Sequence, residues 1–225
     1  MIDPTQQLKH ALAAMDLAFA PLGGPSNFVG GCTHCYIPAD LESLAGPVHQ
    51  VLDELVVSVA HKTPDHWDDF PHLYRRLTPR IIRLLTANEL DHSLVASRLL
   101  AAGWQAWPAP ERTALDGFWR AWWRSALHIH PGTGHVCDVL EVLAVTSGTL
   151  APWLDMWART RTRAADLHLA DALEHWLIED ELANLRLGFY EELHASPQLL
   201  PWLLSLEPGR ISAAQQSAVE QLTYG

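Results

Sequence analysis

Prolines that directly follow a capping residue recur in this chain and divide it into short helical segments. Asp3-Pro4, Thr63-Pro64 and Thr78-Pro79 each join a side chain that can cap a helix to a proline that fits its first turn. Apolar residues after the first of these points recur at helical spacing, beginning with Leu8 and Leu12. No segment shows the β-branched alternation between hairpin turns that strands require. The sequence therefore predicts an all-α fold.

The same punctuation predicts where the helices lie. The expected helical ranges are 4–19, 38–45, 47–61, 91–102, 110–127 and 135–146, with further helices starting at Pro64 and Pro79 and about five in the C-terminal third, the last opening at Ser212. An irregular loop at about 21–37 separates the first two helices and carries two of the three cysteines.

Two similar segments suggest how the helices are arranged. Residues 150–154 (LAPWL) and 199–203 (LLPWL) match in register and lie 49 residues apart, close to the period of two-helix solenoid repeats. We therefore expect stacked antiparallel helical pairs, as in a HEAT-like α-solenoid, with an irregular helical bundle as the alternative. The length of 225 residues fits one domain covering 1–225.

The charge balance limits the classes of partner. The chain carries 26 acidic and 15 basic residues, a net charge of −11, which disfavours nucleic acid as a partner because a polyanion requires a concentrated basic face. No apolar run approaches the roughly 20 residues of a membrane span, so no membrane partner is expected. The odd count of 3 cysteines argues against a secreted disulfide framework. We expect a cytoplasmic protein of unknown oligomeric state.

Ten tryptophans are spread along the predicted helices. Most are expected in the core, with each indole N–H bonded to a partner. The alternative is that some line a groove for a peptide, since tryptophan is a favoured anchor at interfaces. Trp104 and Trp107, beside two prolines, are the pair expected to be exposed.

The feature most specific for chemistry is Cys32-Thr33-His34-Cys35 in the irregular loop. Two thiolates at C-x-x-C spacing reach one cation from a tight turn, which is why the spacing recurs in zinc sites. The remaining ligands must come from elsewhere, and the nearby candidates are His66, Asp69 and His72. Asp69 and His72 are three residues apart, hence on one face of a helix. The predicted site is a structural zinc held by Cys32, Cys35, Asp69 and His72.

Other interpretations of the cysteines remain open. The two cysteines could instead be free thiols or a redox-active dithiol. A third alternative is that they bind a catalytic zinc with an open position, although no HExxH or comparable motif accompanies them. Cys137 and His135 form a weaker second candidate pair. Glu191-x-x-His194 is a single copy of a motif that di-iron bundles need twice, so a surface turn is expected there. No nucleotide-binding or hydrolase signature is present, and we predict no catalytic residues.

Arginines interrupt the acidic character near Pro79. Arg76, Arg80 and Arg83 are spaced like one helical face beside a predicted helix start, which favours anions. The first interpretation is a surface bonded to neighbouring carboxylates; the second is a contact for an anion or an acidic partner.

Several short segments together resemble a bacterial family of uncharacterised all-helical proteins. The segments are the C-x-H-C element at 32–35, the acidic cluster at 67–69, the helix start at 77–81 and the stretches 150–154 and 167–171. The resemblance covers most of the chain, with about one extra residue between Trp67 and Pro79. It implies an all-helical fold and the cysteine pair, and it transfers no catalytic residue.

These features favour a non-enzymatic helical scaffold that binds another protein and contains a metal-clamped loop. This expectation depends on the helical pattern, the aromatic content and the lack of catalytic signatures. A shared fold alone is weak evidence for a shared function. The alternatives are a metal-dependent enzyme with an open zinc site and a redox sensor using Cys32 and Cys35.

Overall fold

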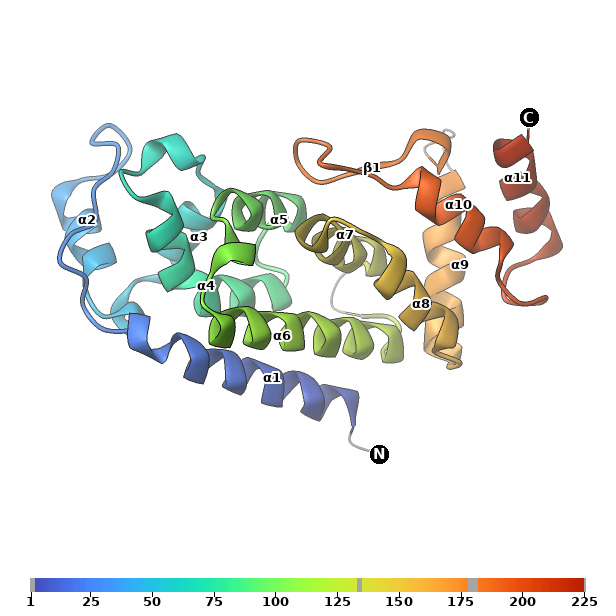
Figure 1. The fold of residues 1–225 in the computed structure, drawn as a ribbon, viewed down its shortest axis with the longest axis horizontal. Helices are drawn as coiled ribbons and strands as arrows, with labels where there is room; N and C mark the ends of the chain where they lie inside the picture. Colours follow the sequence, from blue (N-terminus) through green and yellow to red (C-terminus); the bar gives the residue numbers. More distant parts are fainter. Residues whose placement is uncertain (1–2, 133–134, 178–181, 225) are drawn as a thin grey trace. The chain divides into compact units, whose positions relative to one another are not determined.

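The computed structural model describes residues 3–132, 135–177 and 182–224 (Figure 1). Within these ranges the chain forms eleven α-helices and one two-stranded hairpin, which confirms the predicted all-α fold. The chain divides into two compact units, unit 1 up to Ala121 and unit 2 from Trp122. The division falls inside helix α6 (Ala109–His128), where the sequence shows no change of composition.

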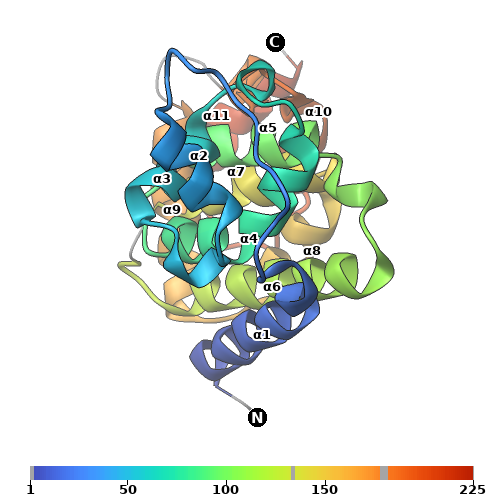
Figure 2. The same cartoon turned by 90° about the vertical axis from the view of Figure 1, so that its left-hand side faces the viewer.

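Unit 1 is built around α4, which packs against α1, α3 and α5. Its helices are α1 (Pro4–Phe19), α2 (Pro38–Ala45), α3 (Asp53–His61), α4 (Phe70–Thr86), α5 (His92–Ala101) and the first part of α6, and its 3-10 turns are η1 (Ala20–Leu22), η2 (Val48–Gln50), η3 (Pro64–His66) and η4 (Trp104–Ala106). Most of α4 is buried, because apolar residues such as Leu77, Ile81 and Leu85 face its three neighbours. The loop between η1 and α2 runs past α2 (Figure 2).

Side-chain caps fix several helix starts in unit 1. Asp3 accepts a hydrogen bond from the Gln6 amide at 3.2 Å, as the Asp3-Pro4 pattern predicted. Asp91 caps α5 in the same way through the Leu94 amide at 2.8 Å. After α5, Gly103 adopts a φ of 65°, a left-handed conformation that favours glycine and ends the helix.

The predicted helix start at Thr78-Pro79 is wrong. Both residues lie inside α4, which begins at Phe70, nine residues before the predicted start, where Asp69 caps the helix and Pro71 occupies its first turn. Thr78 is fully buried, and its hydroxyl donates to the Tyr74 carbonyl at 2.9 Å instead of capping a helix. Packing of the apolar face on α1, α3 and α5 therefore outweighs the cost of a proline inside the helix.

The helix predicted over 47–61 is interrupted. The chain forms η2, turns at Val51 and Leu52, and starts α3 only at Asp53. Leu52 in this turn is 63% exposed, so this apolar residue does not join the core. The Arg80 guanidinium donates to the carbonyls of Val48 and Val51, and these bonds stabilise the break because they satisfy carbonyls that a continuous helix would have bonded internally.

Unit 2 contains the remaining helices and the hairpin. Its elements are α7 (Val136–Ser147), α8 (Ala151–Arg159), α9 (Arg163–Leu177), β1 (Arg186–Leu187), β2 (Leu193–His194), α10 (Ser196–Leu204) and α11 (Ala213–Tyr224). The hairpin was not predicted, because two-residue strands are too short for an alternating pattern to show. Glu191 lies in its turn with a φ of 57°, so the Glu191-x-x-His194 motif is a turn, as expected. Four α-helices, rather than five, occupy the described part of the C-terminal third.

Helices pack in pairs, such as α3 with α4 and α10 with α11, in keeping with the predicted helical pairs. The two similar segments, however, occupy different positions in their helices. Pro152 lies in the first turn of α8, whereas Pro201 lies inside α10. The solenoid repeat therefore stays a prediction.

All ten tryptophans are buried, none more than 9% exposed. The prediction that Trp104 and Trp107 are exposed is wrong, since they are 6% and 7% exposed. The Trp107 indole donates to the Ala102 carbonyl at 3.0 Å, which satisfies its polar atom inside the core. The expected core placement of the tryptophans is thus confirmed, but the expectation that each indole N–H has a partner is wrong, since those of Trp67 and Trp202 are buried without a hydrogen bond to the described residues. None of the described helices is both long and apolar enough to cross a membrane.

Candidate metal centre

The cysteine loop lies beside the turn η3 because the two segments pair through their backbones. The Cys32 amide donates to the His66 carbonyl at 2.8 Å, and the Asp68 amide donates to the Gly30 carbonyl at 3.1 Å. Gly31 and Trp67 form an antiparallel bridge between these two bonds. This pairing places Cys32 next to His66, although 33 positions separate them in the sequence.

A glycine at position 31 allows this close approach. A Cβ atom at Gly31 would lie 2.9 Å from Cε3 of Trp67, and one at Gly30 would overlap the Asp68 carboxylate. Any other residue at Gly31 would push the loop away from the Trp67 ring, because that ring is buried and has no room to move. Gly31 is therefore part of what positions the cysteines, whereas the Asp68 and Phe28 side chains near Gly30 are exposed and could move aside.

A tight turn then brings the two thiols together. The amides of Cys35 and Tyr36 both donate to the Cys32 carbonyl at 3.0 Å, so the chain reverses within the motif. The two sulfur atoms and a ring nitrogen of His66 all lie within 4.8 Å of one another, and Cys35 Sγ is 3.7 Å from His66 Nδ1. Ligands on a tetrahedral zinc ion are about 3.8 Å apart for two sulfurs. These three residues lie close enough to hold one metal ion.

Tyr36 anchors the end of the motif. It is 4% exposed, its ring packs on Trp67 with centroids 4.5 Å apart, and its hydroxyl is 2.7 Å from Ser58 Oγ on α3. The motif is thus fixed on one side by the backbone bridge and on the other by α3. Such outer contacts orient the ligands of a metal site.

The two thiols differ in acidity. The pKa of Cys32 is lowered to about 7, first by the hydrogen bond with His66 and then by backbone hydrogen bonds at His34 and Cys35. The pKa of Cys35 is raised, first by partial desolvation and then by the neighbouring Cys32. Cys32 therefore has substantial thiolate character at neutral pH, and the thiolate is the form that binds metal.

This difference predicts an order of alkylation in metal-free protein. Iodoacetamide at pH 7 should modify Cys32 first, with a rate that rises as the pH passes through about 7, because only the thiolate reacts. Cys137 should react last, since burial raises its pKa and shields it. Peptide mapping by mass spectrometry between about pH 5.5 and 9 measures all three rates. Faster modification of Cys35 than of Cys32 at pH 7 would contradict the assigned acidities.

The predicted ligands Asp69 and His72 lie elsewhere. The Asp69 carboxylate accepts a hydrogen bond from the His72 amide at 3.1 Å and so caps α4. Both residues line a separate pocket of about 430 Å³ together with Arg75 and Trp107. Neither belongs to the group of ligand atoms around the cysteines. The structure brings His66, the nearer of the candidates, to the thiols instead.

The second candidate pair is built differently. The His135 ring accepts a hydrogen bond from the Cys137 amide at 3.3 Å, so it caps α7 rather than facing a metal with the thiol. Within the residues the structure describes, the cluster of Cys32, Cys35 and His66 is the one group of three or more close metal-ligating side chains.

The three arginines proposed as an anion contact form hydrogen bonds and ion pairs with other groups of the protein. Arg80 donates to Asp53, and Arg83 donates to Asp16. Arg76 is only 3% exposed and bonds backbone carbonyls. Arg80 and Arg83 fit the first interpretation, a surface bonded to neighbouring carboxylates, whereas Arg76 does not, because it is buried and bonds carbonyls.

Arg76 ties the start of the cysteine loop to the far end of helix α2. Its guanidinium donates to the carbonyls of Leu22 (3.2 Å) and Gly24 (2.7 Å) before the loop. It also donates to the carbonyls of Leu44 and Gly46, and to Ala45 at 3.5 Å, at the end of α2. One buried side chain of α4 therefore closes the segment that contains Cys32 and Cys35.

In comparisons with protein families, curated proteins and solved structures, none matched this chain. The resemblance to a bacterial helical family therefore stays a prediction, and the functional conclusions depend on the geometry of the site.

Proposed function

We propose that this chain is a zinc-binding helical protein in which Cys32, Cys35 and His66 hold the ion. The observation that carries the proposal is the convergence of three soft or borderline donors within 4.8 Å on a preformed turn. Thiolate and imidazole together favour zinc over hard cations such as magnesium or calcium. The lowered pKa of Cys32 supports binding at neutral pH, because metal and proton compete for the sulfur.

The ion's role in this proposal is to clamp the irregular loop against η3. The loop displays two large apolar side chains on either side of the cysteines, Phe28 and Ile37, which are 71% and 63% exposed. A clamped loop presents such side chains in a fixed arrangement, which lowers the entropy cost of binding a partner. We therefore retain the proposal of a helical scaffold that binds another protein. The free state of all three cysteines fits the reducing cytoplasm.

The number of ligands favours a second candidate, an open zinc site. Three donors come from the described residues, whereas a closed structural site has four. Two cysteines and one histidine with a water in the fourth position are a known catalytic set. In cobalt-substituted protein, a small added ligand such as thiocyanate would change the visible spectrum of an open site and leave that of a closed site unchanged.

Elemental analysis tests the proposal. Protein purified without added metal should contain about one equivalent of zinc, and Cys32→Ser should lose most of it, because removing a thiolate ligand weakens structural zinc sites severely. Cys137→Ser is the matched control and should keep the full equivalent. Absence of metal from the parent protein after zinc addition and dialysis would overturn the proposal. A reversible disulfide between Cys32 and Cys35 in that sample would then favour the redox interpretation.

A further inference from the structure

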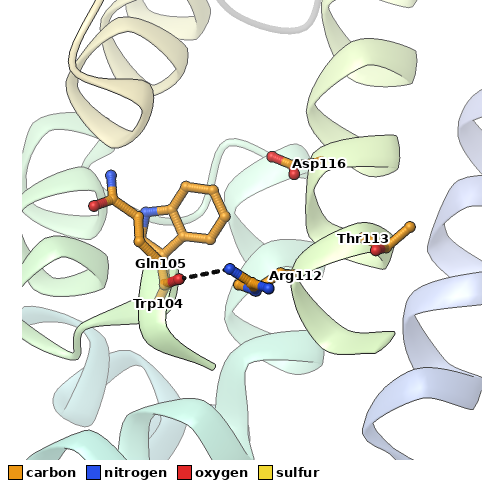
Figure 3. Close-up of a pocket in the computed structure, with 5 residues that line it drawn as sticks. All are labelled: Trp104, Gln105, Arg112, Thr113 and Asp116. Atoms are coloured by element: carbon orange, nitrogen blue, oxygen red, sulfur yellow. Dashed lines mark hydrogen bonds between the residues drawn. The ribbon is translucent and has the colours of Figure 1, made fainter. Parts of the chain in front are cut away.

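Unit 1 has a second pocket that neither the metal centre nor its loop uses. It lies where η4 meets the start of α6 and has a volume of about 360 Å³, lined by Trp104, Gln105, Arg112, Thr113 and Asp116 (Figure 3). This volume is within the range of small-molecule sites. The charged side chains and the indole that line it indicate which chemistry it fits.

A guanidinium and a carboxylate line this pocket without forming an ion pair with each other. Arg112 and Asp116 are one helical turn apart on α6, a spacing at which such side chains commonly form an ion pair. Instead, Arg112 Nη1 donates to the Gln105 carbonyl at 3.2 Å, and this is its one hydrogen bond within the described residues. Asp116 has no hydrogen bond or ion pair within the same ranges. A guanidinium and a carboxylate are therefore both available to a ligand.

An indole forms the opposite wall. Trp104 is 6% exposed, so its ring is held firmly by the core and offers only part of its surface. Figure 3 shows the indole on one side of the pocket and the side chains of Arg112 and Asp116 on the other. A ligand between them would have an apolar surface on one side and two opposite charges on the other.

We propose that this pocket binds a free α-amino acid as its zwitterion. Arg112 would receive the carboxylate, Asp116 the ammonium group, and Trp104 an apolar side chain. A simple anion is disfavoured by Asp116 and by the net charge of −11, and a simple cation is disfavoured by Arg112. The Cβ atoms of residues four apart on a helix are about 5–6 Å apart, so the two charges of the ligand must be close together. An α-amino acid meets this requirement, whereas the terminal charges of a peptide are farther apart.

The test uses L-phenylalanine as the probe and the full chain labelled with ¹⁵N. Saturable shifts of indole N–H signals are expected, with a dissociation constant of about 1 mM because the two charged groups are exposed to solvent. Arg112→Gln and Asp116→Asn should each weaken binding at least about tenfold, since each removes one charged contact. Both side chains are on the surface, so the variants should fold. Arg120→Gln, on the same helix outside the pocket, should bind like the parent.

Two analogues identify the role of each charge. 3-Phenylpropionate lacks the ammonium group, so it should bind the parent at least about tenfold more weakly and lose nothing further in Asp116→Asn. L-Phenylalaninamide lacks the carboxylate and should show the same pattern with Arg112→Gln. The proposal is overturned by the lack of saturable shifts up to about 20 mM L-phenylalanine, or by equal binding of all three compounds.

Discussion

Replacing Arg76 with methionine should destabilise unit 1 by about 4 kcal/mol or more, the largest effect expected of any single side chain described above. Methionine keeps much of the apolar stem but removes the guanidinium that bonds five backbone carbonyls. A buried carbonyl left without a donor costs about 1–3 kcal/mol. The bond to Leu44 is buried and those to the other four carbonyls are partly buried, and among the described residues only Ala45 keeps another donor, the Ser26 amide, so much of this cost should appear. Urea unfolding followed by circular dichroism measures the difference.

Arg83→Met is the matched control for this experiment. Arg83 lies on the same helix, and its ion pair with Asp16 is about half exposed on both sides, with 47% of each side chain accessible. The same substitution there should cost less than about 1 kcal/mol, because exposed ion pairs contribute little. If both variants lose the same stability, the carbonyl contacts of Arg76 do not hold the fold.

The second large effect is expected on metal affinity. His66→Ala should weaken zinc binding at least about 100-fold, because changes in residues that merely support a ligand already cost 10–100-fold. His66 supplies the one imidazole of the cluster, and its ring nitrogen is 3.7 Å from Cys35 Sγ. Competition between the protein and a colorimetric chelator measures the affinity.

His72→Ala discriminates between the ligand set predicted from the sequence and that in the structure. The His72 amide bonds the Asp69 cap, and this contact survives removal of the imidazole, so the fold should be unaffected. Zinc affinity should stay within about twofold of the parent if His66 is the ligand. A large loss of affinity in His72→Ala with little loss in His66→Ala would restore the set containing Asp69 and His72.

The sequence predicted the helices well wherever a local signal determines their ends. Asp3 and Asp91 cap their helices as their positions indicated, and Gly103 ends α5. The Thr78-Pro79 pattern misled because it is a local signal that tertiary packing overrode: α4 buries its apolar face through that point. Thr63-Pro64, where a helix was also predicted, starts only the three-residue turn η3 and has no side-chain cap. The cap-then-proline pattern is thus good evidence for a helix start only where the packing of the following residues supports one.

The candidate metal centre was half predictable for a related reason. The C-x-x-C spacing identified both thiols, because their proximity depends on a single turn. The histidine could not be chosen from spacing, since its position depends on the register of the bridge between Gly31 and Trp67. Asp69 also had a competing role that the sequence did reveal, as a capping residue before a helix with proline in its first turn. Weighing that role would have favoured His66.

The position of Arg76 affects how the proposed zinc site would bind and release its ion. Its bonds to Leu22 and Gly24 on one side and to the end of α2 on the other close the segment 22–46, which contains the cysteine loop and α2, without help from an ion. Closing a loop lowers the conformational entropy of the chain. Because the Arg76 bonds close this segment when the protein folds, metal binding does not have to supply that free energy. In the proposed zinc protein, exchange of the ion would then require only a local opening of this closed segment, without unfolding of the helical core of unit 1.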